Sequence, residues 1–146
     1  MEFTLQMSGL KELDQALAQL PEATADRVLV EALKRAAEPM VVEARMRAPK
    51  RSGTGWRHMW ESIAARKAEV NEEGVATVTI GPDRAHFYGM FAEFGTRHEP
   101  MDPFLRPTFD LLAERAMQDA GFEILAGVTA TLERYVRNAR DLGYIQ

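Results

Sequence analysis

The sequence predicts an α+β fold: a small antiparallel sheet of three or more strands, packed against a long kinked N-terminal helix and a long C-terminal helix. Three observations carry this prediction. Period-two alternation marks short strands, helical spacing covers two long runs, and strands and helices are segregated rather than regularly alternating. At 146 residues, the chain is expected to form one domain spanning residues 1–146.

The composition is that of an ordinary globular protein, with 46% hydrophobic and 27% charged residues. A formal net charge of -4 gives no overall attraction to nucleic acid or to an anionic membrane. The chain has no cysteine, which excludes disulfides and thiolate metal sites. No apolar run approaches the ~18 residues of a membrane span, and the first residues lack a signal-peptide pattern. No membrane contact is therefore expected.

Three segments predict the strands of the sheet. Glu2–Met7 alternates apolar and polar residues and reads as a half-buried strand. Arg66–Val70 and Val75–Ile80 flank the turn-forming residues Asn71–Gly74, and together they predict a β-hairpin. A sheet this small leaves exposed edges, which proteins cover or pair with a neighbour. Self-association is therefore expected.

Two helical segments are predicted before residue 50. A leucine at every third or fourth position from Leu10 to Leu20 predicts a short amphipathic helix. Helical spacing of apolar residues from Glu22 to Ala48 predicts a long helix of about seven turns. Pro39 should kink this helix one turn upstream, and Pro49 closes it.

A long C-terminal helix is predicted from Leu105 to Leu142, where apolar residues form one stripe. Gly121 and Gly127 each disfavour a helix by about 1 kcal/mol relative to alanine. They therefore predict a bend, or a break into two helices, between them. Gly143 is a candidate cap for the C-terminal end.

Residues 49–55 predict a loop, because proline, serine, threonine and two glycines occur together. Lys50, Arg51 and Arg57 make this loop basic, so it could meet DNA phosphate or an acidic partner. Solvated charge without a partner is the alternative interpretation. A short helix with both tryptophans on one face is predicted next, from the spacing of Trp56, Met59, Trp60 and Ile63.

The stretch from His86 to Phe109 combines aromatic side chains with turn-forming residues. Its first half predicts a short helix that Gly95 ends in the left-handed conformation. Pro103 and Pro107 fix the backbone before the C-terminal helix, and Phe104 can anchor the turn in the core. These features favour a rigid surface corner with a binding role. A hydrophobic corner without further role is the alternative.

Residues that could carry catalysis or hold a metal form no recognised pattern. His98 with Glu99 and Asp102 is one metal candidate, and Asp83 with His86 is the other. Neither has the spacing of a zinc site. The glycine-rich loop lacks the spacing of a phosphate-binding loop, and no nucleophile elbow supports a Ser–His–Asp arrangement. No catalytic residue, metal or cofactor is predicted.

Two segments resemble a known family: AEFGT, residues 92–96, and PFLRPTF, residues 103–109. They are similar to the signature of the head–tail joining proteins (neck, tail-completion or minor tail components) of long-tailed double-stranded-DNA bacteriophages and prophages. Ala48-Pro49, Thr54-Gly55, Ser62-Ile63 and the run from Leu5 to Leu17 are similar to further parts of the family pattern. The Trp-rich segment GWRHMW, residues 55–60, departs from it.

The resemblance implies a non-enzymatic structural protein of the virion neck or tail, assembled in the bacterial host cytoplasm. It would form a ring between the head connector and the tail tube or terminator, and double-stranded DNA would pass through without sequence-specific binding. Lys50, Arg51 and Arg57 would face DNA or a neighbouring ring. The organising residues of the corner would be Phe91, Glu93, Phe94, Gly95, Thr96, Pro103, Phe104, Arg106 and Pro107.

Two other functions stay open on the sequence. One is a tail terminator protein, a related structural role that stops growth of the tail tube. The other is a small phage-derived, metal-dependent enzyme that would use His86, His98 and nearby acidic residues.

Overall fold

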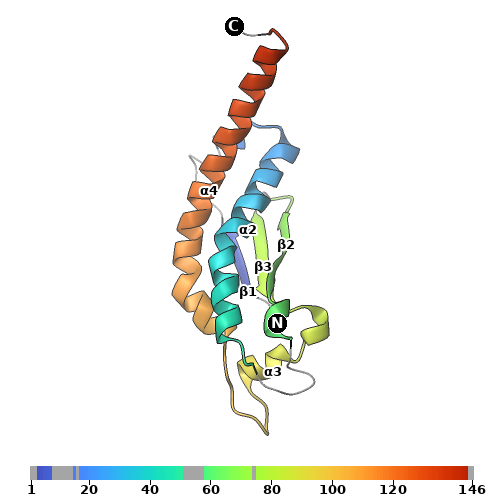
Figure 1. Cartoon of the computed structure of the whole chain (residues 1–146), viewed down its shortest axis with the longest axis vertical. Coiled ribbons are helices and arrows are strands. Elements are labelled where there is room, and N and C mark those ends of the chain that lie inside the picture. Colours follow the sequence, from blue (N-terminus) through green and yellow to red (C-terminus); the bar gives the residue numbers. More distant parts are fainter. Residues whose placement is uncertain (1–2, 8–14, 16, 51–57, 74, 145–146) are drawn as a thin grey trace.

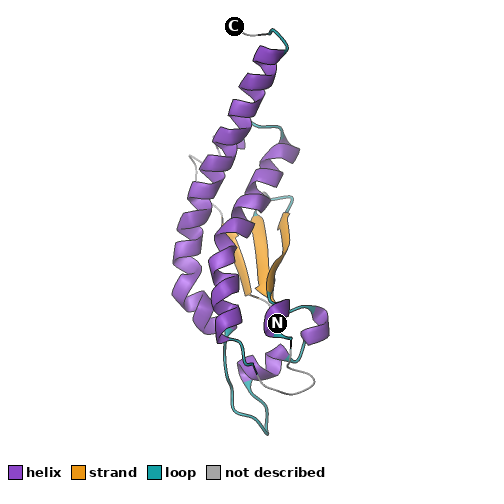
Figure 2. Cartoon of the chain, viewed as in Figure 1, coloured by secondary structure: helices purple, strands orange, loops and turns teal. Residues whose placement is uncertain are grey.

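Two long helices and a three-stranded sheet form the frame of the protein (Figures 1 and 2). The computed structural model describes residues 3–7, 15, 17–50, 58–73 and 75–144. Helices α2 (Glu22–Arg47) and α4 (Leu105–Asp141) pack against each other, and the sheet packs against α2. This arrangement confirms the predicted α+β fold.

The sheet is antiparallel, with β3 (Ala76–Gly81) between β1 (Phe3–Met7) and β2 (Ala64–Val70). The N-terminal strand therefore pairs with a strand from the middle of the sequence. The register of β2 against β3 shifts between Arg66 and Glu69, which marks a bulge in the edge strand. The predicted hairpin is confirmed, although β2 begins two residues earlier than expected.

The hairpin turn is held by the side chain of Asn71. Its Oδ1 accepts hydrogen bonds from the backbone N–H groups of Glu73, at 3.0 Å, and Val75, at 2.8 Å. Asparagine stabilises turns in this way because its short side chain mimics a backbone carbonyl. The turn signal read from the sequence thus has a local physical cause.

Helix α2 buries one face against both the sheet and α4. Pro39 lies exposed inside the helix, which is assigned as one element through it; the kink that the sequence predicted stays a prediction. The helix ends at Arg47, and the extended backbone of the cap residue Ala48 suits the residue before Pro49. Its buried residues are Val28, Ala32, Leu33, Ala36, Ala37, Met40, Val41 and Ala44.

Helix α4 runs from Leu105 to Asp141 without interruption, so the predicted break into two helices between Gly121 and Gly127 is wrong. The bend that was predicted as the alternative stays a prediction. The reason that the helix is unbroken lies in tertiary packing. A Cβ atom at Gly127 would lie 2.8 Å from Cγ1 of Val28, so this glycine allows α2 and α4 to approach closely. A Cβ at Gly121 would meet nothing within 4 Å. None of the described helices is long and apolar enough to cross a membrane.

Within the described residues, the segment predicted as a two-tryptophan helix contains one 3₁₀ turn, η1 (Trp60–Ser62). The backbone is already extended at Ile63, whose carbonyl accepts a 2.9 Å hydrogen bond from Nε of Arg45. This contact with α2 directs the chain into β2 instead of another helical turn. Met59 and Ile63 are fully buried. The apolar spacing in this segment therefore reflects the burial of these side chains and not a helix. Trp56 lies outside the described residues.

The predicted leucine helix before Pro21 lies mostly outside the described residues. Within the described part, Gln15 and Leu17 are helical. Leu20 is buried in the core and Leu17 packs against it. These two leucines therefore face the core, as the spacing predicted.

Substituting the two glycines of α4 separates helix propensity from helix packing. Gly121→Ala should raise the free energy of unfolding by up to about 1 kcal/mol, because alanine favours the helix and its methyl group would meet no atom within 4 Å. Gly127→Ala should lose that gain and destabilise the protein, because the new methyl group collides with Val28. Urea unfolding of both variants measures the difference. Equal stabilisation by both would show that the helices can separate at no cost.

Candidate interaction site at the helix corner

Helix α3 (Gly89–Phe94) forms a corner with the start of α4 (Figure 1). It follows a 3₁₀ turn, η2 (Arg84–His86), and is joined to α4 by the loop at residues 95–104. Phe104 is fully buried at the end of this loop. A Cβ at Gly89 would lie 3.7 Å from Cζ of Phe104. The corner is thus packed tightly around one aromatic anchor.

The carboxylate of Glu93 caps the N-terminus of α4. It is fully buried and accepts hydrogen bonds from the backbone N–H groups of Phe104 at 2.8 Å, Leu105 at 2.9 Å and Arg106 at 2.9 Å. The first N–H groups of a helix have no partners within it, and the helix dipole favours negative charge there. The cap residue Phe104 has no side chain that could serve. Glu93, on α3, therefore supplies the hydrogen-bond acceptor that the cap residue of α4 does not provide.

Arg106 completes this cluster. Its Nε lies 3.2 Å from Oε1 of Glu93, and one terminal nitrogen donates to the Glu93 backbone carbonyl at 3.0 Å. Its guanidinium also lies 5.1 Å from the centre of the Phe94 ring, a cation–π contact. A buried carboxylate is costly unless it is paired and hydrogen-bonded. The α4 N–H groups and Arg106 together meet that requirement.

The loop after α3 depends on Gly95 and Thr96. Gly95 has φ 73 and ψ 172, so the predicted positive φ is confirmed, but the ψ belongs to a region that essentially only glycine adopts. A Cβ there would lie 3.0 Å from the backbone nitrogen of Met101. The Thr96 hydroxyl accepts from the N–H groups of His98 and Glu99, at 3.2 and 3.1 Å. The loop therefore has a defined shape.

The corner presents apolar side chains outward. We define the apolar corner face as Phe87, Met90, Phe91, Phe94 and Met101, which are between 41% and 62% exposed. The opposite side of α3, with Ala92 and Glu93, is buried. Large apolar side chains gathered on one surface mark interaction sites more often than scattered ones. In Figure 1 this corner lies at the opposite end of the molecule from the tip of α4.

Asp83 stabilises η2 and contacts His86 twice. Its Oδ1 accepts from the His86 backbone N–H at 3.0 Å and hydrogen-bonds the imidazole Nδ1. The side-chain hydrogen bond from His86 lowers the pKa of the Asp83 carboxyl below its ordinary value of 3.8. Burial raises the pKa of the neighbouring Tyr88, and the negative charge of Asp83 adds to that effect.

The structure places the predicted corner residues together and leaves the predicted basic loop largely undescribed. Pro103 is half-buried, and Pro107 lies in the first turn of α4, as expected. Lys50 is exposed, with Nζ 5.5 Å from the centre of the Trp60 ring. Arg51 and Arg57 lie outside the described residues.

The histidines that sequence analysis considered for metal binding have separate surroundings. His58 pairs with Glu61 at 3.0 Å on the surface, His86 pairs with Asp83, and His98 is exposed in the loop. Among the described residues, no three His, Cys, Asp or Glu side chains are grouped so that they could hold a metal ion.

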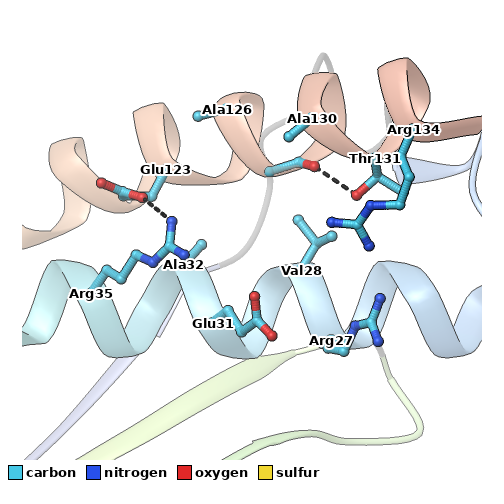
Figure 3. A pocket seen from close by; sticks show the side chains of 11 residues that line it. Arg27, Val28, Glu31, Ala32, Arg35, Glu123, Ala126, Ala130, Thr131 and Arg134 are labelled. Atoms are coloured by element: carbon cyan, nitrogen blue, oxygen red, sulfur yellow. Dashed lines mark hydrogen bonds and ion pairs between the residues drawn. The ribbon is translucent and has the colours of Figure 1, made fainter. Parts of the chain in front are cut away.

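A groove between α2 and α4 was not predicted from the sequence (Figure 3). It has a volume of about 480 Å³, and its α4 wall includes the small residues Ala126, Gly127 and Ala130. Arg35 and Glu123 bridge it with an ion pair of 3.3 Å. The signal that could have found it is the clustering of small residues around Gly127, where two helices approach closely. The arginines that line it are Arg27, Arg35 and Arg134.

The class of protein is thus a small α+β protein in which the hydrogen-bonded cluster of Glu93 and Arg106 builds a rigid corner under exposed apolar side chains. The chain belongs to the HK97-gp10-like family, because residues 11–95 match that family, described as "Bacteriophage HK97-gp10, putative tail-component". The match includes Glu93 and Gly95 and ends before Arg106. The chain is thus a member of a phage tail-component family. No curated protein and no solved structure gives a significant match.

Removing the charge of Glu93 should destabilise the protein strongly. Glu93→Gln should cost about 2 kcal/mol, because hydrogen bonds to a charged group contribute more than neutral ones. Glu93→Ala should cost about 3–5 kcal/mol, because it leaves buried donors unsatisfied. Chemical denaturation measures both. The exposed Glu114→Gln on α4 is the control and should change stability by less than about 0.5 kcal/mol. A Glu93→Gln variant as stable as the control would contradict the capping role.

Asp83→Asn should show a pH-dependent loss of stability. Because the folded-state pKa of Asp83 is lowered, its ionised form stabilises the protein above pH 3.8, and this contribution is lost as pH falls through the folded-state pKa. The variant should therefore have a lower Tm at neutral pH, and the Tm difference should shrink below pH 3.8. Thermal unfolding across pH tests this, with Asp110→Asn as the exposed control. A Tm difference that stays constant with pH would refute it.

Proposed function

We propose that this protein is a non-enzymatic structural component of the phage neck that joins the head connector to the tail through ring-forming subunit contacts. Family membership supports a phage tail component. The observation that carries the finer proposal is the apolar corner face held over the Glu93–Arg106 cluster. In this proposal residues 1–146 act as one unit located in the virion neck or tail, after assembly in the host cytoplasm.

The corner has the properties of a contact surface between subunits. Phe and Met side chains are enriched in the buried centres of protein interfaces. The backbone beneath them is fixed by the hydrogen bonds of Glu93 and by the conformation of Gly95. A surface that is already ordered loses less conformational entropy on binding. The residues that we assign to this role are Phe91, Glu93, Phe94, Gly95, Thr96, Pro103, Phe104, Arg106 and Pro107.

The basic loop fits a second role in the same assembly. In a ring that surrounds the DNA path, Lys50, Arg51 and Arg57 would face DNA phosphate or an adjacent ring. Contacts of this kind are electrostatic and carry no sequence information. Double-stranded DNA would therefore pass without sequence-specific binding, and the partners would be the head connector and the tail tube or terminator.

Deleting the gene in its phage tests the neck role. We expect filled heads and finished tails to accumulate separately, with infectivity lost and restored by the gene supplied in trans. Electron microscopy of lysates reads this out directly. Tails of uncontrolled length would instead favour the alternative, a tail terminator protein. Normal infectious virions would refute both.

Substitutions on the corner test the contact itself. Phe87→Glu and Met101→Glu, at positions 61% and 62% exposed, should leave the purified protein folded but unable to complement the deletion. A charge placed in an apolar contact is strongly unfavourable. Leu142→Glu, at the 72% exposed tip of α4, is the matched control and should complement. Full complementation by both corner variants would show that the corner is not a contact surface in the virion.

A further inference from the structure

Helix α4 carries an apolar face that nothing in the described part of the chain covers. We define the outer stripe as Leu111, Phe122, Leu125 and Val136, which are between 48% and 73% exposed. At about 100° per residue, the four positions fall within about 60° of one another on the helix. The buried residues of α4, such as Ala120 and Ile124, fall about half a turn away. The stripe therefore faces away from α2.

The spacing of the stripe is symmetrical along the helix. Leu111 precedes Phe122 by eleven residues, and Val136 follows Leu125 by eleven residues. A two-fold axis between Phe122 and Leu125 would therefore bring Leu111 of one copy opposite Val136 of another, and Phe122 opposite Leu125. The same operation brings Gln118 opposite Thr129, two polar residues on the stripe that can hydrogen-bond each other.

The charges beside the stripe favour the antiparallel direction. Asp110, Glu114 and Asp119 lie beside the stripe in the first part of α4, whereas Arg137 and Arg140 lie beside it in the last turns. Parallel pairing would set like charges against each other, and antiparallel pairing sets acidic against basic residues.

One charged pair fits the antiparallel register closely. Arg115 and Glu133 lie on the same side of the stripe. The two-fold axis would place Glu133 of one copy one residue from the position directly opposite Arg115 of the other. Arg115 contacts Asp119 at 3.7 Å, with its side chain 76% exposed, so it can turn to a new partner. Glu133 makes no ion pair with another described residue.

We propose that the outer stripe of α4 pairs with the outer stripe of a second copy, forming an antiparallel two-fold dimer along about 38 Å of helix. Such a contact uses the same patch on both copies and closes at two subunits. It therefore differs from the contact that would build a ring. The dimer is a resting form in which the stripe is covered, and the proposal does not depend on the neck role.

Sedimentation equilibrium of the purified full chain tests the dimer. Between about 1 and about 100 µM, the mean mass should rise from 16.4 kDa toward about twice that value. Phe122→Glu should keep the protein monomeric over the whole range, with an unchanged circular dichroism spectrum. Phe87→Glu, on the corner, is the matched control and should still dimerise. A monomer at all concentrations, or a dimer that Phe122→Glu leaves intact, would overturn the proposal.

Charge reversal and cross-linking test the direction of the pair. Arg115→Glu and Glu133→Arg should each weaken the dimer about fivefold, and the double variant should restore it. The chain has no cysteine, so single cysteines can be introduced freely. Gln118→Cys mixed with Thr129→Cys should cross-link through a short bismaleimide, whereas Gln118→Cys alone should not. Cross-linking of Gln118→Cys with itself would show a parallel pair and overturn the register.

Discussion

The capping of α4 by the buried carboxylate of Glu93 is the constraint on which the rest of the corner depends. Helix α4 is the longest element of the protein, yet its own cap residue offers no side-chain acceptor. The three N–H groups that Glu93 binds tie α3 to α4 across the loop. Because Arg106 also holds the Glu93 backbone carbonyl, neither helix end can move without breaking charge-assisted hydrogen bonds. These bonds hold α3, which carries the exposed Phe91 and Phe94, against the start of α4.

The second constraint is the close approach of α2 and α4 at Gly127 and Val28. It aligns α4 with α2 over much of its length, and the C-terminal turns of α4 continue beyond α2 (Figure 1). Residues 132–144 are accordingly exposed or half-buried. The protein therefore presents two separate surfaces, the corner at one end and the outer stripe along the helix.

The two surfaces suit different kinds of assembly. A ring requires a contact between two different patches, repeated around an axis, whereas a two-fold dimer joins identical patches and stops. A protein that carries both surfaces can therefore make two kinds of contact. Membership in a phage tail-component family fits a protein with more than one contact surface, because a tail component meets other virion proteins.

The sequence by itself determined the strands, the hairpin and the two long helices, because their periodicity and turn residues act locally: Asn71 holds its turn within five residues. It also indicated that residues 86–109 form a corner. It could not show that Glu93 caps α4, because the carboxylate and the N–H groups are about a dozen residues apart and meet only when α3 packs. The predicted break in α4 failed for the same reason. A local penalty at Gly127 was outweighed by a contact with Val28 that exists only in the folded protein.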